Sequence, residues 1–159
     1  MGVFSFVHEL KTNVSPKRLF KALITEPHDV LPKVSPSIKS VVTVQGDGGV
    51  GSINQTNFAD GSPAKPMKNR VEFLDTQNYV SKITLIEGDA IDDKVEKVCY
   101  EMKFEDSKDG GCVLKINSDY HTKGDAVLKE EDIKAGTDYA IGIYKACADY
   151  LVANPHVCA

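Results

Sequence analysis

The sequence has no tryptophan, no apolar run that approaches the roughly 18 residues of a membrane span, and no excess of basic residues. Its 19 Lys and Arg face 23 Asp and Glu, which gives a net charge of -4. Binding to nucleic acid normally needs a basic face that neutralises several phosphates, so we expect neither a nucleic-acid partner nor a membrane partner. The first residues also lack the basic stretch and the small-residue cleavage site of a secretory signal, which predicts a cytoplasmic protein.

The cysteines and histidines form no recognisable ligand pattern. No Cys-x-x-Cys pair occurs, and no histidine has a second strong ligand at helical or strand spacing. We therefore expect isolated reduced thiols, no metal site and no cofactor. The residues concerned are Cys99, Cys112, Cys147, Cys158, His8, His28, His121 and His156.

The length of 159 residues suits one globular domain spanning residues 1–159. From residue 38 to residue 121, apolar and polar residues alternate with period two between turn residues, which predicts six half-buried antiparallel strands. One face of this sheet is polar throughout, which favours a monomer. The alternation predicts three sets that each share a face: Ile38, Val42 and Val44; Met67, Val71 and Phe73; and Val98, Tyr100, Met102 and Phe104.

The two ends of the chain must cover the other face of the sheet. Residues 3–11 alternate like a seventh strand, and Ser15-Pro16 predicts a helix that continues to about Thr25. A long helix is predicted from the acidic turn at residues 130–132 to Asn154-Pro155. Small residues fill its middle, and two interpretations stay open: close packing of the helix on the sheet, or an internal cavity.

A glycine-rich segment connects the first two predicted strands of this sheet. Its glycines match the dinucleotide pattern G-x-G-x-x-G, but residues 52–58 continue as a strand and not as the helix that would hold a pyrophosphate. No Gly-Lys-Ser/Thr follows, so it is not a phosphate-binding Walker loop. We interpret it as a tight hairpin, with a nest of backbone amides for an anion as the alternative. The glycines are Gly46, Gly48, Gly49 and Gly51.

Seven motifs, in order along essentially the whole chain, resemble the class 10 pathogenesis-related proteins of plants, the family of the major birch-pollen allergen Bet v 1. The motifs are Met1–Phe4, Leu19–Ala22, Gly46–Ile53, Leu85–Asp89, Lys94–Val98, Tyr120–Asp125 and Tyr150–Pro155. The resemblance implies an α+β helix-grip fold. In that fold a seven-stranded antiparallel sheet wraps round a long C-terminal helix, with two short helices and a large hydrophobic cavity.

The resemblance also implies a function in plant defence: reversible binding of small hydrophobic or amphipathic metabolites, such as cytokinins and other phytohormones, flavonoids and steroid-like molecules, for storage or transport. Apolar walls drive such binding and a few polar groups orient the ligand. We predict the following ligand-binding residues, with Ser118 as a further polar point: Val30, Ile38, Thr56, Phe58, Met67, Asn69, Ser81, Ile83, Leu85, Val98, Tyr100, Met102, Ile116, Ala135, Tyr139 and Ile143.

Enzymatic relatives supply the alternatives. A cavity enzyme similar to norcoclaurine synthase would need a desolvated lysine, and the inward strand positions between Met67 and Tyr120 hold none. A ribonuclease site proposed for the family needs a lysine, two glutamates and a tyrosine. Here Glu96 and Tyr150 match, but Asn54 and Ala148 replace the other two, which disfavours that activity. We expect no catalytic residues, with the cavity enzyme as the second hypothesis.

Overall fold

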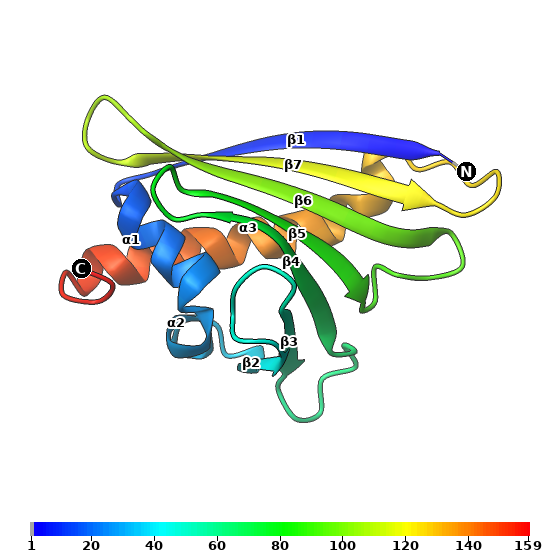
Figure 1. Cartoon of the computed structure of the whole chain (residues 1–159), viewed down its shortest axis with the longest axis horizontal. Helices are drawn as coiled ribbons and strands as arrows, with labels where there is room; N and C mark the ends of the chain where they lie inside the picture. The colour runs from blue at the N-terminus through cyan, green and yellow to red at the C-terminus, as the bar shows by residue number, and fades with distance from the viewer. Residues whose placement is uncertain (1) are drawn as a thin grey trace.

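The computed structural model describes residues 2–159, and its main element is one antiparallel sheet of seven strands (Figure 1). The strands lie side by side in the order β1-β7-β6-β5-β4-β3-β2, so the N-terminal strand pairs with the last one. Their bounds are β1 Val3–Thr12, β2 Ile38–Gln45, β3 Ile53–Phe58, β4 Met67–Asp75, β5 Val80–Glu87, β6 Val95–Asp106 and β7 Cys112–Thr122. This confirms the predicted seven-stranded antiparallel sheet.

The alternation in β6 and β7 explains why these residues form strands. In β7 every second side chain from Cys112 to Thr122 is buried, and the residues between are partly exposed. In β6, Val98, Met102 and Phe104 are buried. Residues directly opposite in an antiparallel pair share a face, and the register sets Met102 against Ile116 and Phe104 against Leu114. The two strands therefore bury one common face.

Two local irregularities overturn predictions of which side chains share a face. The pairing of β2 with β3 shifts between Ile38 and Ser40, and beyond the shift Val41 is buried while Val42 and Val44 are exposed. The pairing of β4 with β5 shifts in the same way between Val71 and Phe73, which leaves Phe73 exposed. A bulge inserts one residue and so moves the following side chains to the other face.

The helices begin and end at capping residues and prolines. The Ser15 side chain accepts from the Arg18 amide at 3.4 Å, with proline at the first helical position, and starts α1 (Pro16–Phe20), which runs on into the π-helical turn η1 (Lys21–Thr25). The short helix α2 (Pro27–Val34) starts at a second proline, and the long helix α3 spans Glu130–Ala153. None of the helices in residues 2–159 has the length and apolar character needed to cross a membrane.

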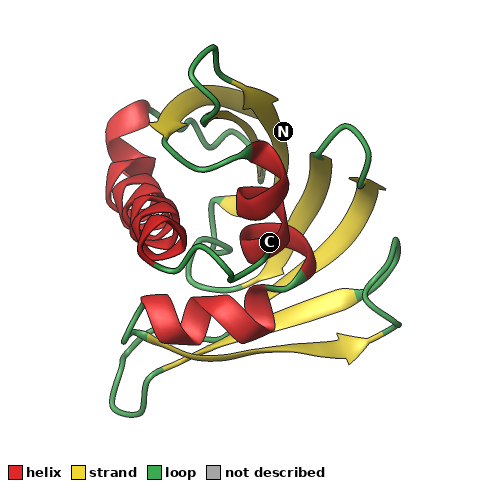
Figure 2. Ribbon diagram, turned by 90° about the vertical axis from the view of Figure 1, so that its left-hand side faces the viewer, coloured by secondary structure: helices red, strands yellow, loops and turns green. Residues whose placement is uncertain are grey.

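The sheet curls strongly, and α3 lies across its open, concave side together with α1 and α2 (Figure 2). The close backbone neighbours of α3 are β1, α1, η1 and α2. Within the described part of the chain, the middle strands β4, β5 and β6 are not among them. The helix is thus held along one edge of the sheet and at its C-terminal end, and it stands away from the centre of the sheet.

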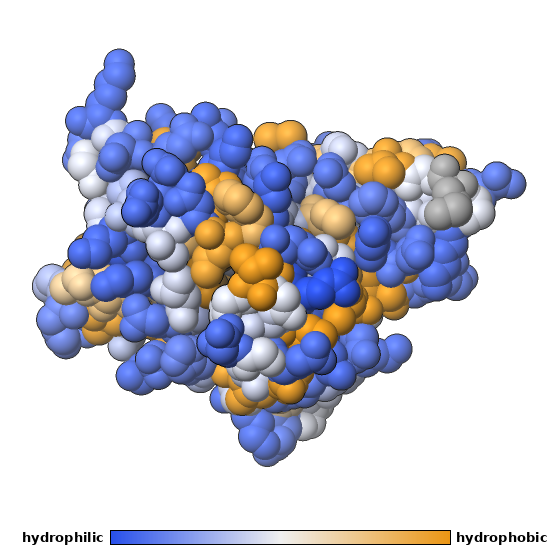
Figure 3. Space-filling view, viewed as in Figure 1, coloured by the Kyte–Doolittle hydropathy of each residue, from blue (hydrophilic) through white to orange (hydrophobic). Residues whose placement is uncertain are grey.

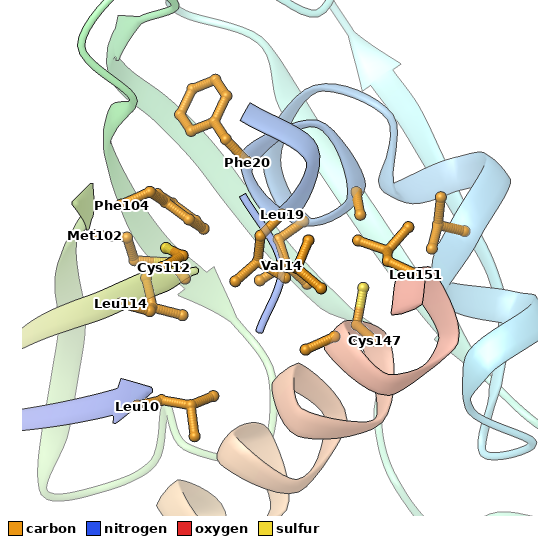
Figure 4. Packing of buried hydrophobic residues seen from close by; sticks show 14 of the residues in the cluster. Leu10, Val14, Leu19, Phe20, Met102, Phe104, Cys112, Leu114, Cys147 and Leu151 are labelled. Atoms are coloured by element: carbon orange, nitrogen blue, oxygen red, sulfur yellow. The ribbon is translucent and has the colours of Figure 1, made fainter. Parts of the chain in front are cut away.

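The buried core falls into two clusters. The larger cluster joins α1, η1 and the C-terminal part of α3 to β6 and β7, and Figure 4 shows Phe20, Leu19 and Val14 facing Phe104, Leu114, Cys147 and Leu151. The smaller cluster contains Leu85, Val95, Val98, Tyr120, Leu128 and Ile133. A ligand in the interior would have to lie between these two clusters.

Candidate functional site in the interior

Strand pairing brings most of the predicted site residues onto one continuous inner surface. The register of β5 with β6 sets Ser81 opposite Met102, Ile83 opposite Tyr100, and Leu85 opposite Val98. The next strand pair continues the row, with Tyr100 opposite Ser118 and Met102 opposite Ile116. On the other side, Asn69 of β4 lies opposite Leu85, Thr56 opposite Met67, and Ile38 opposite Phe58.

Six of the predicted inward residues are only partly buried, and two of them, Met67 and Tyr100, pack against the smaller cluster. Phe58, Asn69 and Ile83 on the strands, and Ile143 on α3, keep accessible surface. The three apolar ones are packed into neither of the two clusters. An inward-facing apolar side chain that keeps accessible surface is not fully covered by packing partners, so it is available for contact with a ligand. Val30 of α2 and Ile38, by contrast, are buried and close one end of this region.

The predicted residues of α3 separate into inward and outward positions. Successive residues turn by about 100° around a helix, so Ala135 lies about 200° from the buried Ile133. Ala135 is accordingly exposed, and the structure does not place it in the interior as predicted. Tyr139 is 45% exposed, and its hydroxyl shares a hydrogen bond with Ser37 Oγ, next to β2. Tyr139 therefore lies at the rim of the interior rather than inside it.

The sequence predicted Ile133 and Tyr144 on the helix face that packs on the sheet, but it did not assign Tyr144 or Thr137 to the binding site. Thr137 and Tyr144 follow Ile133 at helical spacing and lie on the same side of the helix. Thr137 is a hydrogen-bond partner of Tyr120 on β7, and Tyr144 interacts electrostatically with Tyr120 and Tyr100. The phase set by Ile133 and Tyr144 is the signal that could have added Thr137 to the predicted site.

Three phenols therefore meet in the interior from β6, β7 and α3. Burial raises the pKa of Tyr144 to about 12 and raises that of Tyr100 well above its usual value, and each shift is increased by the neighbouring Tyr120. The pKa of Tyr120 is also raised by burial, against the lowering effect of its hydrogen bonds to Tyr100 and Thr137. These shifts describe a poorly hydrated region that holds neutral hydroxyl groups and disfavours negative charge.

The glycine-rich segment forms the predicted hairpin, between β2 and β3. Gly46, Gly48 and Gly51 have positive φ angles of 88°, 99° and 90°, which glycine adopts without strain. The amide of Gly48 donates to Ser52 Oγ at 2.8 Å, that of Gly49 to Asp47 Oδ1 at 2.9 Å, and that of Gly51 to the Val71 carbonyl at 2.8 Å. Because the protein itself uses these donors, the hairpin interpretation is favoured over an anion nest.

Charged side chains lie outside the apolar interior. Lysines of the middle strands pair with glutamates across the outer face, as in Lys82 with Glu101 at 3.4 Å and Lys115 with Glu105 at 3.1 Å. The two matching positions of the ribonuclease pattern lie apart: Glu96 is exposed beside the smaller cluster, and Tyr150 packs against the larger one. Within residues 2–159 no three potential metal ligands converge.

An open groove of about 740 Å³ lies between the end of β1, the β6–β7 turn and the C-terminal half of α3. Its lining includes Lys11, Lys145, Asp106 and Asp149, and it contains none of the predicted site residues. Apolar side chains instead gather at the centre of the face shown in Figure 3, ringed by hydrophilic ones, over the region between α2 and the strands β4 and β5. We therefore take the interior, and not this charged groove, as the candidate site.

The curled sheet with a C-terminal helix across its concave side defines the helix-grip class of α+β folds. The chain belongs to the Pathogenesis-related protein Bet v 1 family, whose model matches residues 1–154. It is 43% identical to the major strawberry allergen Fra a 1-2 of Fragaria ananassa, over 98% of both chains. It is also 43% identical to pathogenesis-related protein STH-2 of Solanum tuberosum, over 100% of both.

Solved structures agree with this assignment. The crystal structure of Ara h 8.0201 matches with a TM-score of 0.86 and 32% identity, covering 96% of this chain and 100% of that one. Norcoclaurine synthase from Thalictrum flavum matches with a TM-score of 0.74 and 22% identity, covering 95% of this chain and 87% of the enzyme. At that identity the second likeness shows the shared fold alone.

Proposed function

We propose that this protein reversibly binds small hydrophobic or amphipathic plant metabolites in the interior between the sheet and α3, and stores or carries them without chemical change. Cytokinins and other phytohormones, flavonoids and steroid-like molecules are the classes that we put forward. The protein acts in plant defence, in the cytoplasm and as a monomer. The observation that carries the proposal is the set of inward apolar residues, Phe58, Ile83 and Ile143, that the two core clusters leave partly uncovered.

The energetics favour an apolar guest. Each Å² of apolar surface removed from water contributes roughly 25 cal/mol, so uncovered inner walls favour uptake of an apolar molecule. The same region raises the pKa values of Tyr100 and Tyr144, which is the behaviour of a site with little water. A buried lysine for condensation chemistry is missing from the inner faces of β4 to β7 as described, which supports binding without reaction.

A cavity-filling variant tests the proposal. Ile83→Trp adds volume at the uncovered inner wall, and Val7→Trp adds the same side chain at a position of β1 that is 70% exposed. We expect Ile83→Trp to weaken the binding of trans-zeatin and of quercetin at least tenfold by isothermal titration calorimetry, and Val7→Trp to leave it unchanged. Mass spectrometry of the recovered ligand should find it unaltered, and light scattering should give the monomer mass.

The stability of the same variant provides an independent check. A tryptophan forced into a filled core costs about 1–3 kcal/mol, whereas one that enters empty space costs little. We therefore expect the unfolding midpoint of Ile83→Trp to stay close to that of the unmodified protein. Loss of stability together with unchanged ligand binding would mean that the interior is filled, and the proposal would fail.

A further inference from the structure

His8 lies on the inner face of β1. Along this strand Val3, Val7 and the other odd-numbered residues are exposed, while the even-numbered residues are partly or fully buried. In the pairing with β7, His8 lies directly opposite Ile116, which is buried and belongs to the larger cluster. The imidazole therefore extends into the apolar side of the sheet, where a polar ring needs a partner.

The ring has one nitrogen without a partner. Of the side-chain nitrogen and oxygen atoms in residues 2–159, Nε2 of His8 is the one that is buried with no hydrogen-bond partner. A buried polar atom left unpaired is costly, and native structures rarely retain one without a reason. An unpaired atom on the wall of a binding region is a place for a ligand to supply the missing partner.

The position of His8 relates it to the space between the two core clusters. Its neighbour Phe6 belongs with the smaller cluster and packs edge-on against Tyr120, with ring centroids 5.8 Å apart. On the other side, Leu10 belongs to the larger cluster. His8 thus lies where one cluster ends and the other begins, on the same inner face as the phenols of Tyr100 and Tyr120.

The surroundings select the kind of group that would pair with this nitrogen. On β7 the residues opposite His8 and the other inner-face positions of β1 are Leu114, Ile116, Ser118 and Tyr120, and none of them carries a formal charge. A buried carboxylate there would lose its hydration without gaining a fixed cation, whereas a neutral hydroxyl loses much less. A hydroxyl also both donates and accepts, so it pairs with Nε2 whether or not that nitrogen carries a proton.

We propose that His8 Nε2 is a specificity-determining hydrogen-bond site for a neutral hydroxyl of the bound ligand, so that the interior selects flat apolar molecules that carry a phenol or alcohol group. This inference rests on the proposed binding function. It makes the ligand hydroxyl the partner of His8 and leaves the rest of the ligand to the apolar wall around Ile83. Hydroxylated molecules are then preferred over methylated ones of the same shape.

Three naphthalenes of matched shape test this preference: 2-naphthol, 2-methylnaphthalene and 2-naphthoate, each measured by displacement of an apolar fluorescent dye at neutral pH. With the unmodified protein we expect 2-naphthol to bind more tightly than 2-naphthoate. In His8→Phe we expect binding of 2-naphthol to weaken about tenfold and binding of 2-methylnaphthalene to stay equal or tighten. Val7→Phe, on the outer face of the same strand, should leave the binding of both 2-naphthol and 2-methylnaphthalene unchanged.

Each other outcome is decisive. An equal ratio of 2-naphthol to 2-methylnaphthalene binding before and after His8→Phe overturns the inference, because the nitrogen is then satisfied by water or by the protein. Tighter binding of 2-naphthoate that is lost in His8→Phe also overturns it, in favour of a charged imidazole. If His8→Phe does not fold, His8→Gln keeps a polar group there and should preserve part of the hydroxyl preference. Failure of the dye and all three compounds to bind would instead refute the binding function itself.

Discussion

Replacing Arg18 with alanine should loosen the C-terminal end of α3. This residue lies on α1, and its guanidinium donates to the carbonyls of Leu151 and Asn154 at 2.9 Å and to that of Val157 at 2.8 and 3.1 Å. The last carbonyls of a helix have no partner within the helix, and α3 has no basic residue in its last turn. Arg18 supplies from another helix the cation that α3 lacks.

The expected loss follows from these contacts. Three N–H groups of Arg18 make the four hydrogen bonds, and a net contribution of about 1 kcal/mol for each gives about 3 kcal/mol in the free energy of unfolding. In a chain of this size, 1 kcal/mol corresponds to about 2–4 °C in Tm, so Arg18→Ala should melt about 6–12 °C lower. Hydrogen exchange should become faster at residues 148–158.

Two companion variants make the result interpretable. Lys17→Ala removes a neighbouring exposed cation and should leave Tm within about 1 °C, since exposed charges contribute little. Arg18→Lys keeps the charge but loses the planar guanidinium, so its Tm should lie between that of Arg18→Ala and that of Lys17→Ala. If Arg18→Ala has the same Tm as Lys17→Ala, Arg18 does not hold the end of α3, and the reasoning is refuted.

Three further predictions concern the hairpin, the thiols and the phenols. Gly46→Ala should lower the free energy of unfolding in urea by more than about 1–2 kcal/mol. The reason is that Gly46 has a φ of +88° and the new Cβ would lie 2.9 Å from Ser52 Cα. A free energy of unfolding within about 0.5 kcal/mol of the original would contradict this. Cys99, which is partly exposed, should react with iodoacetamide at pH 8 well before Cys147. Cys147 is buried, and burial raises its pKa from about 9 to about 12, which lowers its thiolate fraction about a thousandfold. Mass spectrometry that finds Cys147 alkylated first would refute the burial of Cys147. The pKa of Tyr144 is raised in the folded state, so the stability that its neutral phenol contributes is complete below about pH 10 and is lost as the pH rises towards 12. Tyr144→Phe should therefore reduce the fall in the free energy of unfolding over this pH range. An identical fall in both proteins would count against a buried phenol.

The regular elements of this fold were predictable because their signals are local. Alternation in β6 and β7 and the cap at Ser15 each extend over a few residues, and the structure confirms these elements. The side on which a residue lies was less predictable wherever a bulge intervenes, as at Val42 and Phe73, because the bulge depends on the partner strand.

The candidate site depends on contacts between distant segments, and the sequence predicted it less completely. Ala135 was assigned to the interior, although the phase set by Ile133 turns it outward. His8 could be placed on a strand but not recognised as unpaired, since that depends on what surrounds its ring. Pairing partners and unfilled volume are properties of the whole fold, and no stretch of sequence encodes them alone.

The pairing of β1 with β7 also has a consequence for biosynthesis. Val3 lies opposite His121, so the first strand to leave the ribosome finds its hydrogen-bonding neighbour only after most of the polypeptide has been made. Bringing such remote segments together is slow, and until then the edge of β1 is open to mispairing with another nascent chain. The sheet can be completed only when translation is nearly finished, so β1 stays without its neighbour for most of synthesis.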